Sequence, residues 1–243
     1  MRLFDRALSR LHPEQLPVMG ARLRSIGRQI WVADRELQMP GGIRLPIRMV
    51  VMGDGRGNLL CYSPVELDEG TAEALDGLGK VRWIVAPNRY HRSFTAGCMS
   101  RYPQAQVSGF LPPPGDGFAA PAAVPFGGCE LTTVSLRTGF AEIVAYHDLS
   151  ETLVVADLLF NVRNGNRRLQ AVMRVNGAWQ KAGHTRLQRW LILRDPDGLT
   201  KFRRWALSRP FVQISMAHGL IVQEDARECL YRLQRGGPFG APH

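Results

Sequence analysis

Cysteine is scarce in this chain of 243 residues, and its four cysteines, at positions 61, 98, 129 and 229, form no C-x-x-C pair. Their spacing excludes a zinc ribbon and disfavours a secreted disulfide scaffold. No apolar run approaches the ~18 residues that a membrane span needs. The first 17 residues carry charges throughout and lack the unbroken apolar stretch of a signal peptide. These absences predict a reduced, cytoplasmic protein without a transmembrane segment.

Motifs of nucleophilic enzymes are absent too, since there is no G-x-S-x-G elbow and no cysteine stands in a nucleophile motif. The composition is that of an ordinary globular protein, with 45% hydrophobic and 21% charged residues. The length suits one large domain. A chain of this size buries roughly 70% of its unfolded surface, so it needs neither disulfides nor a metal ion merely to fold.

Short apolar runs separated by turn residues predict a strand-rich fold. Strands are expected at 29–33, 46–52, 59–63, 81–86, 130–136, 142–146, 152–160 and 211–216, and helices at 64–79, 93–102, 199–207 and 225–234. A proline- and glycine-rich passage at 111–128 is expected to be a loop. This order predicts an α+β protein with two sheets and helices packed outside them. Residues 29–235 would form one domain, between a helical or irregular lead-in at 1–28 and a tail at 236–243.

Three segments carry polar residues at or just after expected strands. The strand at 81–86 leads into Pro87-Asn88-Arg89-Tyr90-His91-Arg92, the segment VVADLLF contains Asp157, and the segment MAHG contains His218. In order and spacing, residues 29–235 resemble the metallo-β-lactamase fold, and the chain is similar to a divergent bacterial branch of that superfamily. The resemblance implies a four-layer αβ/βα sandwich with hydrolase ancestry.

The metal-binding motif of that family, H-x-H-x-D-H, is degraded in this chain. Its first two histidines match Pro87 and Arg89, its aspartate matches His91, and its last histidine matches Arg92. A further family histidine, expected near 138–139, is missing as well. The family's bridging aspartate and terminal histidine match Asp157 and His218.

The resemblance therefore implies that the first metal position has lost its three histidines, whereas the second retains His91, Asp157 and His218. Two histidines and one carboxylate form a competent metal triad, which suits zinc or iron and leaves positions open for water or substrate. We expect one such ion or none. In the metal-free reading, the histidines are hydrogen-bonded turn or core residues and Asp157 holds backbone N–H groups.

Arg89 and Arg92 keep two functions open. In a single-metal hydrolase they would be catalytic residues that stabilise the anion formed when activated water attacks an ester, thioester or phosphoester. Their fixed charges also repel a cation. In a metal-free protein they would hold Asp157 or bind a small anionic ligand or a partner bidentately.

The excess positive charge of the chain lies in one segment. Residues 163–209 hold 12 of the 31 basic residues and 2 of the 21 acidic ones, a balance of +10, while the other residues hold 19 of each. Clustered arginine with Trp179, Trp190 and Trp205 could bind nucleic acid. The expected helix around Thr200–Arg209 could lie on an anionic membrane surface. In the resembled family, insertions at this point shape the substrate pocket, which favours a solvated helical insertion over the active-site face. Nucleic-acid binding is disfavoured because no recognised binding module is present.

Overall fold

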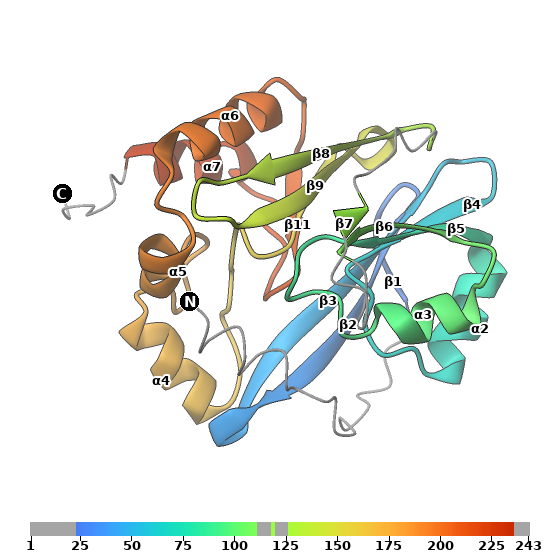
Figure 1. The fold of residues 1–243 in the computed structure, drawn as a ribbon, viewed down its shortest axis with the longest axis horizontal. Helices are drawn as coiled ribbons and strands as arrows, with labels where there is room; N and C mark the ends of the chain where they lie inside the picture. The colour runs from blue at the N-terminus through green and yellow to red at the C-terminus, as the bar shows by residue number, and fades with distance from the viewer. Residues whose placement is uncertain (1–22, 111–117, 120–125, 236–243) are drawn as a thin grey trace.

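The computed structural model describes residues 23–110, 118–119 and 126–235, and its strands form two sheets (Figure 1). In the larger sheet, seven strands follow one another in chain order: β1 (Arg24–Gly27), β2 (Ile30–Met39), β3 (Ile43–Gly53), β4 (Asn58–Tyr62), β5 (Lys80–Ala86), β6 (Gln106–Phe110) and β7 (Phe118–Ala119). In the smaller sheet, the order is β11 (Gln213–Met216), β10 (Thr152–Val155), β9 (Ala141–His147) and β8 (Cys129–Ser135). The pairs β4–β5, β5–β6 and β10–β11 are parallel, and the others are antiparallel.

The two sheets face each other across a shared apolar core. Val50, Tyr62 and Val85 of the larger sheet pack in one cluster with Ile143 and Val154 of the smaller sheet, and each is at most 1% exposed. The Tyr62 hydroxyl donates a hydrogen bond of 2.7 Å to the Ile143 carbonyl, which ties the sheets together. Both faces of the central strands are buried, so these strands are apolar nearly throughout rather than alternating.

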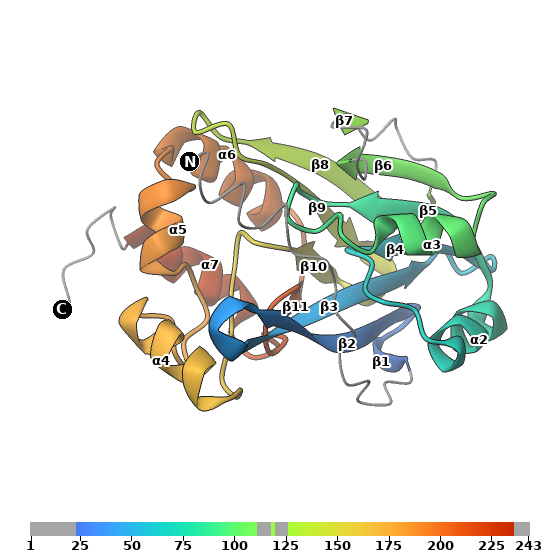
Figure 2. The ribbon, with the colours of Figure 1, turned by 60° about the horizontal axis from the view of Figure 1, so that its bottom comes forward.

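Helices cover the outer face of each sheet (Figure 2). The helices α2 (Glu69–Leu78) and α3 (Thr95–Arg101) pack on the larger sheet through buried residues such as Leu75 and Cys98. The helices α6 (Pro196–Leu207) and α7 (Ala226–Arg235) pack on the smaller sheet through Phe202, Ala206 and Leu230. The layers thus run helix, sheet, sheet, helix. The predicted α+β fold class with a four-layer αβ/βα sandwich is confirmed.

Several elements differ from the sequence expectation. Strand β1 lies inside the expected lead-in and pairs with β2, and strand β6 was not expected. The strand expected at 152–160 ends at Val155, because the next three backbone N–H groups bind the Glu142 carboxylate instead of a neighbouring strand. The first 22 residues, the tail at 236–243 and most of the loop expected at 111–128 lie outside the described residues. The division into lead-in, domain and tail stays a prediction.

The basic segment is helical, and its last helix is α6 of the outer layer. Ahead of it come α4 (Arg167–Val175) and α5 (Arg186–Leu191), which the sequence analysis did not place individually. Each has a polar N-cap, Asn166 for α4 and Thr185 for α5, whose side chain accepts a backbone N–H of the first turn. Helix α4 packs beside the tip of the β2–β3 hairpin, where Leu169 and Met173 share a cluster with partly buried Ile43 and Leu45.

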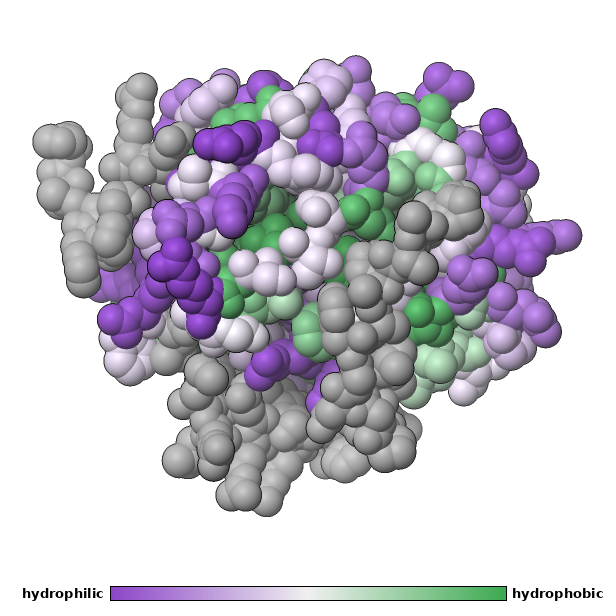
Figure 3. Space-filling view, turned by 45° about the horizontal axis from the view of Figure 1, so that its top comes forward, coloured by the Kyte–Doolittle hydropathy of each residue, from purple (hydrophilic) through white to green (hydrophobic). Residues whose placement is uncertain are grey.

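Apolar side chains reach the surface in a few places. Figure 3 shows one face, on which hydrophilic residues surround a central area of apolar ones. Among the described residues, the large apolar side chains that are exposed are Val172, Val175, Leu187, Trp190, Val212, Leu220 and Tyr231. Four of these lie on α4 and α5. No described helix is both long and apolar enough to cross a membrane.

Candidate metal site

The ends of two adjacent parallel strands bring Asp157 and His218 together. In the β10–β11 ladder, Val155 stands opposite Met216, so the residues two positions further along each chain leave the sheet side by side. The loops that follow also pair, since the Asn161 N–H donates to the His218 carbonyl at 3.0 Å and the Leu220 N–H donates to the Asn161 carbonyl at 2.9 Å. The register of the smaller sheet therefore determines the spacing of these two side chains.

His91 comes from the other sheet, five residues after the end of β5. A local turn places it, because the Asn88 side-chain oxygen accepts the backbone N–H groups of Tyr90 at 2.9 Å and His91 at 3.2 Å. The His91 ring then lies with its centroid 5.1 Å from that of His218. The site is thus built where strand ends of the two sheets meet.

The three predicted ligands converge on one point. One ligand atom from each of His91, Asp157 and His218 lies within 4.8 Å of the other two. His91 Nε2 is 3.3 Å from Asp157 Oδ2, and His218 Nε2 is 3.1 Å from Asp157 Oδ1. All three side chains are nearly buried, with at most 11% of each exposed. The structure brings these residues together as a triad, and metal binding by it stays a prediction.

The hydrogen bond made by His218 Nδ1 limits the protonation states open to Nε2, the ring nitrogen that faces Asp157. His218 Nδ1 lies 2.8 Å from the Pro46 carbonyl oxygen, which can only accept, so Nδ1 carries a hydrogen and donates. His218 Nε2 therefore meets Asp157 either with a second proton or with a lone pair. A lone pair facing a carboxylate oxygen requires a cation between them, and a ring N–H donated to a backbone carbonyl is the usual support of a metal-ligating histidine.

The hydrogen-bond partner of the His91 ring permits either tautomer. Its Nδ1 lies 2.8 Å from the Ser63 hydroxyl, which can donate or accept. His91 Nε2 can accordingly carry a hydrogen toward Asp157 or offer a lone pair to a cation. Phe160 stacks on the other histidine, His218, at 4.6 Å between ring centroids, and so closes the apolar side of the site.

Hydrogen bonds with the side chains of Glu142 and Asn88 fix the loop after β10, which contains Asp157. The Glu142 carboxylate accepts the backbone N–H groups of Ala156 at 2.9 Å and Asp157 at 2.7 Å, and is completely buried. The Asn88 side-chain amide donates to Glu142 at 3.0 Å and to Asp157 Oδ2 at 2.9 Å. Gln188, from α5, donates to the Asp157 carbonyl. These contacts leave the Asp157 backbone little freedom to move.

The pKa values of the two buried carboxyl groups, Asp157 and Glu142, are shifted in opposite directions. Burial raises the pKa of Asp157, but the nearby His91 and His218 outweigh it and hold that pKa well below its usual range. Burial, followed by the charge of Asp157, raises the pKa of Glu142 to about 8, although its hydrogen bonds to Ala156, Asp157 and Asn88 oppose the rise. Asp157 therefore keeps its negative charge for a cation at neutral pH.

Arg89 and Arg92 lie in the same loop as His91. Arg89 is exposed, and its guanidinium donates to the Gly139 carbonyl at 3.2 Å. This contact joins the loop after β5 to the turn between β8 and β9. Arg92 is partly buried, and its carbonyl accepts the Thr95 N–H at the start of α3. A catalytic role for either arginine stays a prediction.

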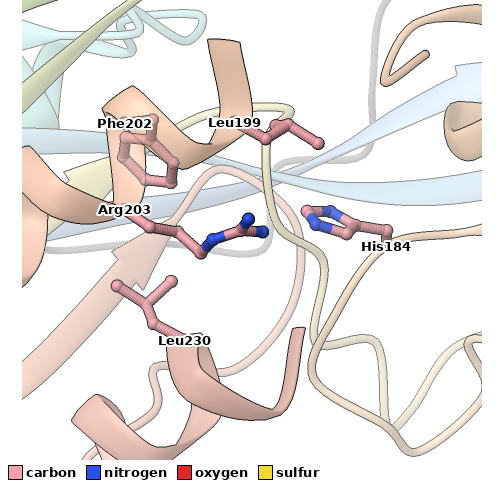
Figure 4. Close-up of a pocket in the computed structure, with 5 residues that line it drawn as sticks. All are labelled: His184, Leu199, Phe202, Arg203 and Leu230. Atoms are coloured by element: carbon pink, nitrogen blue, oxygen red, sulfur yellow. The ribbon is translucent and has the colours of Figure 1, made fainter. Parts of the chain in front are cut away.

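A small cavity lies behind the site, between α6, α7 and the segment before α5 (Figure 4). It has a volume of about 10 Å³, room for about one water molecule, and is lined by His184, Leu199, Phe202, Arg203 and Leu230. His184 Nδ1 donates to the Leu158 carbonyl at 2.7 Å, one residue beyond Asp157. Arg203 Nε is buried and has no hydrogen-bond partner within the described part of the chain.

We predict that His184 makes the protein less stable in acid. Burial lowers the pKa of His184 from 6.5 to about 4, and Arg189 and Arg203 add to the effect. The unfolded chain therefore binds more protons than the folded one between these two values, so the free energy of unfolding falls as the pH drops from about 6.5 to about 4. The contribution is up to about 3 kcal/mol.

Urea unfolding at a series of pH values would measure this effect, with His184→Gln as the comparison. The glutamine amide can still donate to the Leu158 carbonyl but does not titrate. The stability difference between the two proteins should change across this pH range and be constant above it. A difference that is independent of pH would contradict the prediction.

Comparison with solved structures identifies the architecture. A protein assigned as diflavin flavoprotein A 5 (fragment 1–254) from Nostoc sp. PCC 7120 superposes with a TM-score of 0.62 at 11% identity, covering 88% of this chain and 95% of that one. The metallo-β-lactamase DIM-1, exposed to ceftazidime, gives 0.61 at 10% identity over 91% and 99%. The mono-zinc form of the metallo-β-lactamase FIM-1 from Pseudomonas aeruginosa gives 0.57 at 13% over 90% and 96%. The chain has the metallo-β-lactamase fold.

Sequence comparison alone does not reach this result. No protein-family model matches the chain, and no curated protein is detectably similar to it in sequence. Because these sequence identities are low, the solved structures show only that the chain has the metallo-β-lactamase fold. The fold that the family resemblance implied is confirmed.

Sequence analysis missed the residues that support the triad. Glu142 was read only as the start of a strand, although a carboxylate in an otherwise apolar run is a signal for a buried partner. Asn88 was passed over within the degraded motif itself. The partner residues Ser63 and Pro46 carry no sequence signal, because their roles arise from sheet contacts between distant segments.

Proposed function

We propose that this protein is a hydrolase that uses one divalent metal ion, held by His91, Asp157 and His218, to cleave an ester, thioester or phosphoester. The observation that carries the proposal is the donor arrangement at His218. Its Nδ1 donates to the Pro46 carbonyl while its Nε2 faces Asp157 at 3.1 Å, an arrangement that a cation between the two side chains completes.

The residues present fit zinc or iron. Two ligands that are each 2.0–2.1 Å from a tetrahedral zinc ion lie about 3.3 Å apart. His91 Nε2 lies 3.3 Å from Asp157 Oδ2 and His218 Nε2 lies 3.1 Å from Asp157 Oδ1, so each histidine meets a different carboxylate oxygen at a distance near that spacing. One ligand atom from each of the three residues lies within 4.8 Å of the other two. Two imidazoles and one carboxylate leave at least one coordination position open, as a catalytic site requires.

A bound metal ion supplies Lewis acidity, which lowers the pKa of water and polarises a carbonyl or phosphoryl oxygen. The chain's own residues do the rest. Asp157 remains ionised and is kept in place by hydrogen bonds with Asn88 and Glu142. Arg89 and Arg92, which lie within two residues of His91 in the sequence, would supply positive charge to an anion that develops on the substrate. Phe160 keeps water from one side of the His218 ring.

The proposal is limited to one ion and to a divergent branch of the fold. Pro87 and Arg89 stand at two of the first metal position's three histidines, and 138–139 holds no histidine for the third. Proline offers no ligand atom, and arginine is a fixed cation. A second ion would therefore lack its ligands.

Metal content tests the proposal directly. Untagged protein, as purified and after incubation with zinc and with ferrous iron, would be analysed for bound metal beside a His218→Ala variant. We expect about one ion per chain in the wild type and none in the variant. His184→Gln is a matched control, because it removes a histidine outside the triad and should retain the ion. Circular dichroism would verify that each variant is folded.

A wild-type protein that takes up no metal under any of these conditions overturns the proposal. The function to test next would then be the metal-free one, in which Arg89 or Arg92 binds a small anionic ligand. A protein that binds one ion should be screened with nitrophenyl esters, thioesters and bis-nitrophenyl phosphate, with His218→Ala as the inactive reference.

A further inference from the structure

Helices α4 and α5 expose apolar side chains that no other described element covers. Val172 and Val175 on α4 are 38% and 73% exposed, and Leu187 and Trp190 on α5 are 39% and 65% exposed. Each pair is spaced by three residues, which places both members on the same face of their helix. Each helix therefore presents a short apolar stripe to the surroundings.

The two stripes lie on helices that are bonded to each other. The Arg186 N–H donates to the Asn176 carbonyl at 2.9 Å, and its guanidinium donates to the Val175 carbonyl at 3.2 Å. The Leu187 N–H is 3.3 Å from the Asn176 side-chain oxygen. The start of α5 is thus bonded to the end of α4, and both views of the ribbon show the helices side by side at one end of the molecule (Figures 1 and 2). We call residues 163–194 the α4–α5 surface.

This surface is strongly positive. Between residues 163 and 194 there are eight Arg or Lys residues and no Asp or Glu. All eight are exposed: Arg163, Arg167, Arg168, Arg174, Lys181, Arg186, Arg189 and Arg194. Within the described part of the chain, none of the eight forms an ion pair with a carboxylate. The charge is therefore available to an external anion.

We propose that the α4–α5 surface binds the headgroup region of an anionic lipid bilayer. Exposed cations surrounding aliphatic side chains and a tryptophan are the combination that holds a protein at a membrane interface. Trp190 suits the headgroup level, because its ring is apolar and its N–H can be hydrated. Nucleic acid could contact the cations and stack on Trp190. It has no apolar region that would bury the three aliphatic side chains, those of Val172, Val175 and Leu187.

Binding to vesicles tests this inference. Full-length protein would be sedimented with phosphatidylcholine vesicles, with and without phosphatidylglycerol, at low and at 0.5 M salt. We expect at least about tenfold tighter binding to the anionic vesicles, lost at high salt. Val175→Ser and the charge reversal Lys181→Glu/Arg189→Glu should each weaken binding by about tenfold or more. Brominated lipid should quench the fluorescence of the wild type more than that of Trp190→Tyr.

Matched controls lie elsewhere on the molecule. Val212→Ser removes an exposed valine, and Arg56→Glu/Arg82→Glu reverses two exposed charges, so both should bind like the wild type. The inference is overturned if the two vesicle types bind equally, or if Val175→Ser leaves vesicle binding unchanged. Single-stranded RNA binding in place of vesicle binding also overturns it. The result is independent of the proposed hydrolase, because vesicle binding needs no metal ion.

Discussion

Replacing Glu142 by alanine should lower the free energy of unfolding by about 4 kcal/mol, because several buried hydrogen-bond donors lose their acceptor together. The substitution removes the only acceptor that the described structure provides for the N–H groups of Ala156 and Asp157, which lie 2.9 and 2.7 Å from the carboxylate. It also removes one acceptor of the Asn88 amide. Urea unfolding followed by circular dichroism would measure the loss.

The same substitution should disturb the site as well as the fold, because these bonds hold the Asp157 loop. We expect Glu142→Ala to bind metal more weakly than the wild type, and Glu142→Gln, which keeps one acceptor oxygen, to lose less on both measures. Glu73→Ala, at an exposed position on α2, should change stability by no more than about 0.5 kcal/mol. A loss below about 1 kcal/mol for Glu142→Ala would show that the loop does not depend on this carboxylate.

Gly219→Ala should also cost about 4 kcal/mol, for a steric reason. Gly219 has φ of +98°, and a Cβ atom there would lie 2.2 Å from the Asn161 carbonyl oxygen. That oxygen cannot move away freely, because it accepts the Leu220 N–H at 2.9 Å. The strain falls on the residue next to His218, so metal affinity should drop together with stability. Thermal unfolding and metal titration would measure the two effects.

Gly70→Ala provides the matched control for this prediction. A Cβ atom at Gly70, on α2, would meet no atom within 4 Å, and its backbone is helical. Alanine there should leave stability unchanged or raise it by up to about 1 kcal/mol. If Gly219→Ala is as well tolerated as Gly70→Ala, the close packing of the two loops at the site is not required.

Much of the candidate site could be anticipated because its predicted ligands follow strands. Asp157 and His218 come directly after buried strands, and His91 follows a third, so the family resemblance could match them position by position. The structure brings all three within 4.8 Å. The arginines could be placed in the same loop, but their contacts could not. That Arg89 bonds the Gly139 carbonyl depends on a loop 50 residues away.

The local sequence pattern did not predict secondary structure correctly where a segment's hydrogen-bonding partner lies outside that segment. Strand β1 has little apolar character of its own and is a strand because it pairs with β2. The expected strand at 152–160 stops early because the Glu142 carboxylate takes the N–H groups that would have continued the ladder. Helices α4 and α5 are short, with nine and six residues, so each repeats its helical period over only about two or three turns of sequence, although both have good N-caps.

The sequence by itself indicated the two-sheet α+β class and most of the strands, and it determined the confinement of net charge to residues 163–209 and the absence of histidine at 87, 89 and 138–139. These properties are local, since each is read from neighbouring residues. Only the tertiary structure decided that His218 Nδ1 donates to the Pro46 carbonyl, that Glu142 is buried next to Asp157 and that the start of α5 is bonded to the end of α4. Hydrogen bonds and packing between distant segments set these features, and a single sequence does not reveal which distant groups will meet.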